Sequence, residues 1–170
     1  DLHGLAMICT AYDLWFHIDG AFGALAKLTE KYSSILKPIE NADSVAFDLH
    51  KWMYMPYEVG CVLIKNKDAH RNTFSYAPDY LMIHDKGLAS GPDSLNNFGI
   101  ELSRGFKALK VWMSMKEHGI KNYTLQIEKN IQQAVYLTTL INNNDDLELL
   151  APTSLNIVCF RFFQSNKTKE

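Results

Sequence analysis

The segment ADSVAFDLHKWMYMPYEVGCVLI, residues 42–64, contains two apolar stretches that predict short β-strands. Ser44–Phe47 forms the first stretch, and Gly60–Asn66 contains the second. Between them, His50 and Lys51 stand side by side and precede bulky aromatic residues. A lysine that such neighbours shield from water has a lowered pKa and becomes a nucleophile, whereas a lysine at an ordinary strand end stays solvated and charged. Both interpretations of Lys51 are open on this segment alone.

The residues before this segment extend the pattern into an α/β fold. Leu14–Asp19 predicts an earlier strand that is broken by two glycines, and Lys27–Pro38 predicts a loop with a short helix. Sites in such sheets lie at the carboxyl ends of the strands. Asp19 and Lys51 each follow an apolar strand, so they would face one crevice if the two strands are neighbours.

The remaining segments are expected to be mostly helical, with one long loop. Thr73–Asn97 lacks hydrophobic periodicity, which favours a surface loop. Apolar residues at helical spacing, beginning with Leu102 and Phe106, predict a helix that Gly119 ends. The other expected elements are a helix at Leu2–Cys9, a helix from Ile120 to the polar run at 142–146, and strands at Leu147–Leu150 and Leu155–Phe162.

The composition is typical of a globular, soluble chain. Its 170 residues are 47% hydrophobic and 21% charged, with a net charge of −2, which suits one ordinary domain with a core. No basic block or long apolar run indicates nucleic acid or a membrane as a partner. Three dispersed cysteines, Cys9, Cys61 and Cys159, favour a reducing, cytoplasmic location with buried or inert thiols, without disulfides or a metal site. The chain opens at Asp1 inside an expected helix, so we expect a piece of a longer protein.

One carboxylate and one amine that face a common crevice suit the cofactor pyridoxal phosphate. This cofactor forms a Schiff base with a lysine, while a carboxylate keeps its pyridine nitrogen protonated and makes the ring an electron sink. The spacing of Asp19 and Lys51 has little specificity by itself. The sequence motifs around the two residues are more specific.

WFHIDGAFGAL, residues 15–25, together with residues 42–64, resembles the group II pyridoxal-phosphate-dependent amino-acid decarboxylases. This family includes aromatic amino acid, histidine and glutamate decarboxylases, and its members typically read H-V-D-A-A-[WY] and then A-D-S-x-x-[WF]-[ND]-P-H-K-W. ELSRGFKALKVWMSMKEHG, residues 101–119, is similar to the family's G-R-R-x-x-A-L-K-x-W helix. LNIVCFRF, residues 155–162, is similar to the strand that opens its C-terminal domain, so the resemblance covers nearly the whole chain.

The resemblance implies an α/β fold of the aspartate-aminotransferase-like class, fold type I. Residues 1–119 would be the C-terminal part of the cofactor-binding large domain. Residues 120–170 would be a linking helix and the start of the small C-terminal α+β domain. The implied activity is decarboxylation of an L-amino acid to the corresponding amine and CO2 by a cytoplasmic homodimer.

The same resemblance assigns roles to five residues. It implies that Lys51 forms the Schiff base, that Asp19 pairs with the pyridinium, and that Ala21 packs against one face of the ring. His50, the second implied catalytic residue, and Asp48 would lie near the phosphate or its water shell, with Asp48 orienting His50 or a backbone amide. Taken singly, Asp19 could instead be a turn or capping residue, and His50 could be only a packed neighbour. Arg104 is expected to anchor the loop before it.

Two departures from the family pattern leave alternatives open. Leu49 replaces the proline before His-Lys, which is expected to change only the stiffness of the backbone. Ala89–Asn97 lacks the loop tyrosine that protonates the product carbanion in typical relatives, so Ser94, a water held by Asp93, or Tyr80 would have to serve. The alternatives are an aldehyde synthase, another lyase or transaminase of the same fold, or an inactive scaffold.

Overall fold

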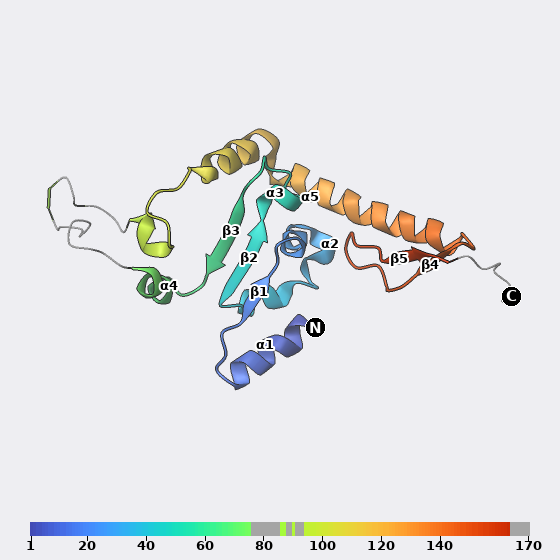
Figure 1. Ribbon diagram of the computed structural model, residues 1–170, viewed down its shortest axis with the longest axis horizontal. Helices are drawn as coiled ribbons and strands as arrows, with labels where there is room; N and C mark the ends of the chain where they lie inside the picture. Colours follow the sequence, from blue (N-terminus) through green and yellow to red (C-terminus); the bar gives the residue numbers. More distant parts are fainter. Residues whose placement is uncertain (76–85, 88–89, 91–93, 164–170) are drawn as a thin grey trace.

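The computed structural model describes residues 1–75, 86–87, 90 and 94–163 (Figure 1). In Figure 1, a small sheet with short helices around it stands beside one long helix, and a two-stranded sheet lies along the far part of that helix. The elements are α1 (Leu2–Ala11), β1 (His17–Asp19), η1 (Gly23–Leu28), α2 (Glu30–Ser33), η2 (Lys37–Asn41), β2 (Ser44–Asp48), α3 (Leu49–Trp52), β3 (Gly60–Ile64), α4 (Lys67–Phe74), η4 (Leu95–Phe98), α5 (Lys107–Asn142), β4 (Leu147–Leu149) and β5 (Phe160–Phe162).

The first sheet has the strand order β1-β2-β3, and its pairings decide where the candidate residues lie. β1 and β2 run parallel, with Asp19 opposite Ala46. β2 and β3 are antiparallel, with Asp48 opposite Gly60. β1 and β2 are therefore neighbours, which meets the condition set by the sequence analysis, and their carboxyl ends lie at the same edge of the sheet.

The first strand is shorter than the sequence predicts, because Leu14, Trp15 and Phe16 lie outside the ladder. Phe16 instead contacts the residue before β2. Its N–H donates to Asp43 Oδ2 at 2.8 Å, and its carbonyl accepts the N–H of Asp43 at 2.9 Å. These bonds fix the register at the start of β2.

The long helix confirms a break at Gly119, where the backbone angles are φ 71° and ψ 151°. The helix begins at Lys107, however, and Leu102 and Phe106 lie before it with 65% and 76% of their surface exposed. Their expected place on a helical face is therefore wrong. The second half ends at Asn142, at the start of the polar run, as expected.

The C-terminal sheet differs in extent from the predicted strands. β4 pairs with β5 in antiparallel fashion, but β5 contains only Phe160–Phe162. Before it, Leu155 has a left-handed φ of 51° and an isolated bridge joins Ser154 to Ile157. A tight turn therefore occupies the part of Leu155–Phe162 in which the sequence predicts extended chain.

The main core lies beneath the segment that follows β2. Trp52, Met53, Met55 and Val59 are each at most 3% exposed. They pack with residues of η1 and of the second half of α5, namely Leu25, Ala26, Tyr123, Ile127 and Ile131. A smaller cluster beneath α1 contains Ala6, Phe16, Ile18 and Ala42.

The structure bears on two expectations from the composition, the state of the cysteines and the absence of a membrane span. All three cysteines are free, and Cys159 is exposed, so the thiols are not all buried. Within the described residues, no helix is long and apolar enough to cross a membrane. The cytoplasmic location and the division into two domains at residue 119 stay predictions.

Candidate active site

Lys51 lies on α3, a single helical turn that follows β2 directly. Leu49 and Trp52 are 9% and 2% exposed and fasten this turn to the core, whereas the Lys51 side chain is 41% exposed. The N–H of Leu49 donates to the carbonyl of Val59 at 2.9 Å. Leucine in place of the family's proline therefore supplies a backbone donor that proline lacks.

Asp19 and Ala21 lie beside the second half of β2. The N–H of Gly20 donates to the Ala46 carbonyl at 2.8 Å, and the N–H of Asp48 donates to the Ala21 carbonyl at 3.0 Å. These bonds keep the segment after β1 alongside β2 as far as Asp48. The Asp19 side chain turns back locally, since its Oδ1 accepts the N–H of Ala21 at 3.1 Å.

Asp48 pairs with Lys51 across one turn of the chain, with Oδ2 and Nζ 2.7 Å apart. The Asp48 carboxylate raises the pKa of Lys51 above its ordinary value, and the charge of Asp19 adds to this effect. Lys51 in turn lowers the pKa of Asp48. The interpretation of Lys51 as a desolvated lysine with a lowered pKa is wrong for this structure, because an adjacent carboxylate outweighs the effect of burial.

His50 is held by Val59, the residue directly before β3. Its Nδ1 accepts the N–H of Val59 at 3.0 Å, and its ring contacts Tyr57 edge-on with centroids 4.4 Å apart. Nδ1 also lies 2.9 Å from the Val59 carbonyl, but the Val59 N–H can only donate and needs Nδ1 as its acceptor. We therefore assign the ring hydrogen to Nε2, which lies 4.0 Å from Asp48 Oδ2. Asp48 thus approaches Lys51 more closely than it approaches His50.

Phe22 and Asn130, which the sequence did not single out, hold this turn in place through Trp52. The Trp52 ring stacks on Phe22 with centroids 4.7 Å apart and an angle of 21° between the planes. The Trp52 indole N–H donates to Asn130 Oδ1 at 3.0 Å. Because Asn130 is 78 residues away from Trp52, no local pattern could have indicated this contact.

Other expected residues lie outside this group. His17, to which the sequence assigns no catalytic role, lies at the start of β1, where its Nδ1 is 2.7 Å from Ser44 Oγ. The Arg104 guanidinium lies against Gly99, and its Nε is 4.0 Å from Glu101 Oε2.

The expected loop Thr73–Asn97 is helical at both ends, where α4 finishes and η4 begins. Of the proposed proton donors, Ser94 is exposed. Tyr80 and Asp93 lie outside the described residues.

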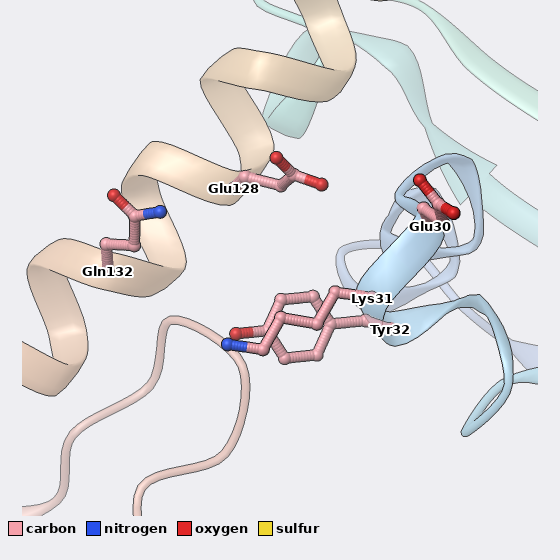
Figure 2. A pocket seen from close by; sticks show the side chains of 5 residues that line it. All are labelled: Glu30, Lys31, Tyr32, Glu128 and Gln132. Atoms are coloured by element: carbon pink, nitrogen blue, oxygen red, sulfur yellow. The ribbon is translucent and has the colours of Figure 1, made fainter.

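A separate pocket of about 280 Å³ lies between α2 and α5 (Figure 2). Figure 2 shows Glu30, Lys31 and Tyr32 on one side and Glu128 and Gln132 on the helix opposite. The Lys31 ammonium lies 5.3 Å from the centre of the Tyr32 ring. Two carboxylates beside one lysine disfavour an anionic phosphate group, so we do not place the cofactor here.

Comparison with known proteins identifies the family. Residues 1–163 match the pyridoxal-dependent decarboxylase conserved domain. The chain belongs to this family. Members of the family use pyridoxal phosphate, and the resemblance seen in the motifs is confirmed over nearly the whole chain.

The individual relatives are much longer than this chain. It is 40% identical over 164 residues to an aromatic-L-amino-acid decarboxylase of Bacillus atrophaeus, covering 96% of this chain and 34% of that protein. It is 29% identical over 161 residues to a 3,4-dihydroxyphenylacetaldehyde synthase of Drosophila melanogaster, covering 95% of this chain and 31% of that protein. The chain thus spans about a third of the length of these curated relatives.

The fold is similar to that of solved family structures. The crystal structure of the Oryza sativa TDC with PLP and tryptamine matches with a TM-score of 0.84 at 24% identity, covering 93% of this chain and 32% of that one. The structure is therefore a mixed α/β part of the fold found in pyridoxal-phosphate decarboxylases.

Proposed function

We propose that the whole protein is a pyridoxal-phosphate-dependent decarboxylase of an L-amino acid, with Lys51 as the residue that bonds covalently to the cofactor. One observation supports this proposal above the others. Asp19 and Lys51 follow paired parallel strands at the same edge of the sheet, and both lie in the segments that carry the family motifs. Decarboxylases among its relatives are pyridoxal-phosphate-dependent carboxy-lyases, which supports this chemistry for the whole protein.

The described residues suit this cofactor chemically. A primary amine and a carboxylate meet the two needs of a pyridoxal group, a covalent attachment and a partner for its ring nitrogen. The Ala21 carbonyl accepts the N–H of Asp48, so Ala21 lies beside this edge, and its small side chain would pack against one face of the ring. The bound cofactor withdraws electrons from Cα of an attached amino acid, so that the bond to the substrate carboxylate can break.

The proton positions follow from the contacts of each side chain. Asp19 would hold a proton on the pyridine nitrogen through charge pairing. Lys51 must lose a proton from Nζ before it can act as a nucleophile, and Asp48 opposes that loss by stabilising the ammonium. His50, with its hydrogen assigned to Nε2, would donate a hydrogen bond to the phosphate or to a water beside it.

The proposal is tested by locating the covalent bond. Borohydride treatment of the full-length protein with pyridoxal phosphate should leave a reduced adduct on the peptide that contains Lys51. Lys51→Ala should abolish both the adduct and amine formation while the fold is retained, because the side chain is 41% exposed and is not part of the core. Lys65→Ala is the matched control, since Lys65 is exposed just after β3 and should not affect either readout. An adduct on Lys65 or Lys67 would overturn the assignment.

An aldehyde synthase is the second candidate, and two observations favour it. The chain has no tyrosine within Ala89–Asn97, and one of its relatives is named an aldehyde synthase. The two activities differ in product and in oxygen use, so amine, aldehyde and oxygen uptake should be measured on the same samples. The homodimeric state stays a prediction, to be checked by light scattering of the full-length protein.

A further inference from the structure

Asn130 connects the long helix α5 with the turn that bears Lys51. Its Oδ1 accepts two hydrogen bonds, from the Trp52 indole N–H at 3.0 Å and from the Tyr54 hydroxyl at 2.7 Å. These donors lie one and three residues after Lys51. A single side-chain oxygen on α5 therefore binds both Trp52 and Tyr54, in the turn that follows Lys51.

The orientation of the Asn130 amide is determined by its partners. An indole N–H can only donate, so the atom that faces it must be the amide oxygen. The amide nitrogen points the other way and donates to Gln133 Oε1 at 3.2 Å. Trp52 is 2% exposed, so its N–H would be buried without a partner if Asn130 lost its oxygen.

Tyr54 has an unusual backbone conformation that depends on its surroundings. Its φ is 55°, in the left-handed region that bulky residues such as tyrosine seldom adopt. Its N–H donates to the Lys51 carbonyl at 3.3 Å, which closes the turn behind the lysine. Such a conformation persists only where neighbouring contacts stabilise it, and the bond from the Tyr54 hydroxyl to Asn130 is one of them.

Trp52 extends the same support to the Asp19 segment. Its ring stacks on Phe22, which follows Ala21 directly. The contacts thus run from Asn130 through Trp52 to Phe22, and they link the chain after Lys51 to the chain after Asp19. A shift of the indole would move the two candidate residues relative to each other.

We propose that Asn130 is a positioning residue, which holds the turn that bears Lys51 in place relative to the segment that bears Asp19, through its hydrogen bonds to Trp52 and Tyr54. The inference rests on the proposed function, because it assumes that the cofactor bonds to Lys51. Asn130 itself is not a catalytic residue. It sets the position of the turn that bears the amine, so its loss alters how the cofactor is held in molecules that are correctly folded.

The test compares three variants of the full-length protein. Asn130→Leu removes the acceptor at similar size, Asn130→Asp keeps an oxygen acceptor, and Gln133→Ala is the control on the exposed side of the same network. The first readout is the rate at which pyridoxal phosphate becomes trappable on Lys51 by borohydride. The second is the visible circular dichroism of the bound cofactor, which reports the orientation of the ring and does not follow global stability.

Asn130→Leu should slow trapping on Lys51 by about tenfold, the effect of leaving a buried donor unpaired. It should also reduce the visible circular dichroism per bound cofactor. Asn130→Asp and Gln133→Ala should stay within about twofold of the wild type in both readouts. Restoration by aspartate would separate the acceptor oxygen from mere packing.

The inference is overturned if Asn130→Leu folds and shows wild-type trapping and circular dichroism. If Asn130→Leu does not fold, Tyr54→Phe decides, because Tyr54 is 56% exposed and loses only its hydroxyl. A smaller loss in the same two readouts supports the inference, and no change in either refutes it. Absence of an adduct on Lys51 in the wild type would instead refute the proposed function, so the two failures are distinguishable.

Discussion

Gly20→Ala should damage this protein even though the family pattern typically has alanine at that position. Gly20 follows Asp19 and donates its N–H to the Ala46 carbonyl. A Cβ added there would lie less than 3.0 Å from the Ala24 Cβ, whereas ordinary contact begins at 3.4 Å. It would also lie 3.2 Å from the Ala46 carbonyl oxygen. Neither neighbour is the end of a flexible side chain, so the backbone must move.

The magnitude follows from the overlap. Overpacking of this kind costs about 1–3 kcal/mol, which corresponds to a factor of about 5 to 160 in a folding equilibrium. The displacement falls on the segment that carries Asp19 and Ala21, and a misplacement of about 1 Å can cost about 100-fold in rate. We expect a lower urea midpoint for the full-length protein and a fall in kcat of about tenfold to 100-fold.

The assay uses a compensating change and a matched control. Gly20→Ala combined with Ala24→Gly removes the closest collision, so the double variant should recover most of the lost stability and rate. Gly23→Ala is the control, since its Cβ would meet only the end of the Leu155 side chain at 3.5 Å. Unfolding midpoints and turnover that are equal in Gly20→Ala and the wild type would refute the reasoning, as would a double variant no better than the single one.

Three further predictions concern single side chains of the candidate site. Asp48→Asn removes the carboxylate that raises the pKa of Lys51, so the pH at which pyridoxal phosphate is captured half-maximally should shift downward; an unchanged pH profile would contradict this. Asp19→Ala should weaken cofactor binding by more than about tenfold in an equilibrium titration, and near-normal rates in Asp19→Asn would mean that the ring charge is not supplied here. Ser94→Tyr should raise the ratio of amine to aldehyde if the wild type makes both, whereas a wild type that makes amine alone, without oxygen uptake, would show that another acid already serves.

The sequence predicted the parts of the site that depend on neighbours in the chain. Asp19 and Lys51 could be proposed as site residues because strand ends and family motifs are local, and the break at Gly119 followed from one glycine between two periodic runs. The pKa of Lys51 was not predictable in the same way. It depends on whether the Asp48 side chain turns toward Nζ or toward His50, which only the geometry of α3 decides.

Contacts between distant segments account for the rest. Asn130 stands in a polar stretch of an amphipathic helix, where nothing local distinguishes it from a solvated residue. Its significance comes from the packing of α5 over the turn that follows β2. The shortened β5 has a similar origin, because the left-handed Leu155 and the Ser154–Ile157 bridge override a run with strong strand propensity.

The bend at Gly119 has a mechanical consequence. Before the bend, Lys107 Nζ lies 2.6 Å from Glu58 Oε1, and Lys110 Nζ donates to the Pro56 carbonyl at 2.9 Å. Beyond the bend, Asn130 accepts from Trp52. Both arms of α5 are thus tied to residues 52–58, and together with that segment they form a closed triangle. At the vertex, the Ser114 and Tyr123 hydroxyl groups hydrogen-bond across the bend. The turn behind Lys51 is thus the third side of a braced triangle, and a change in its length would strain both arms of the helix.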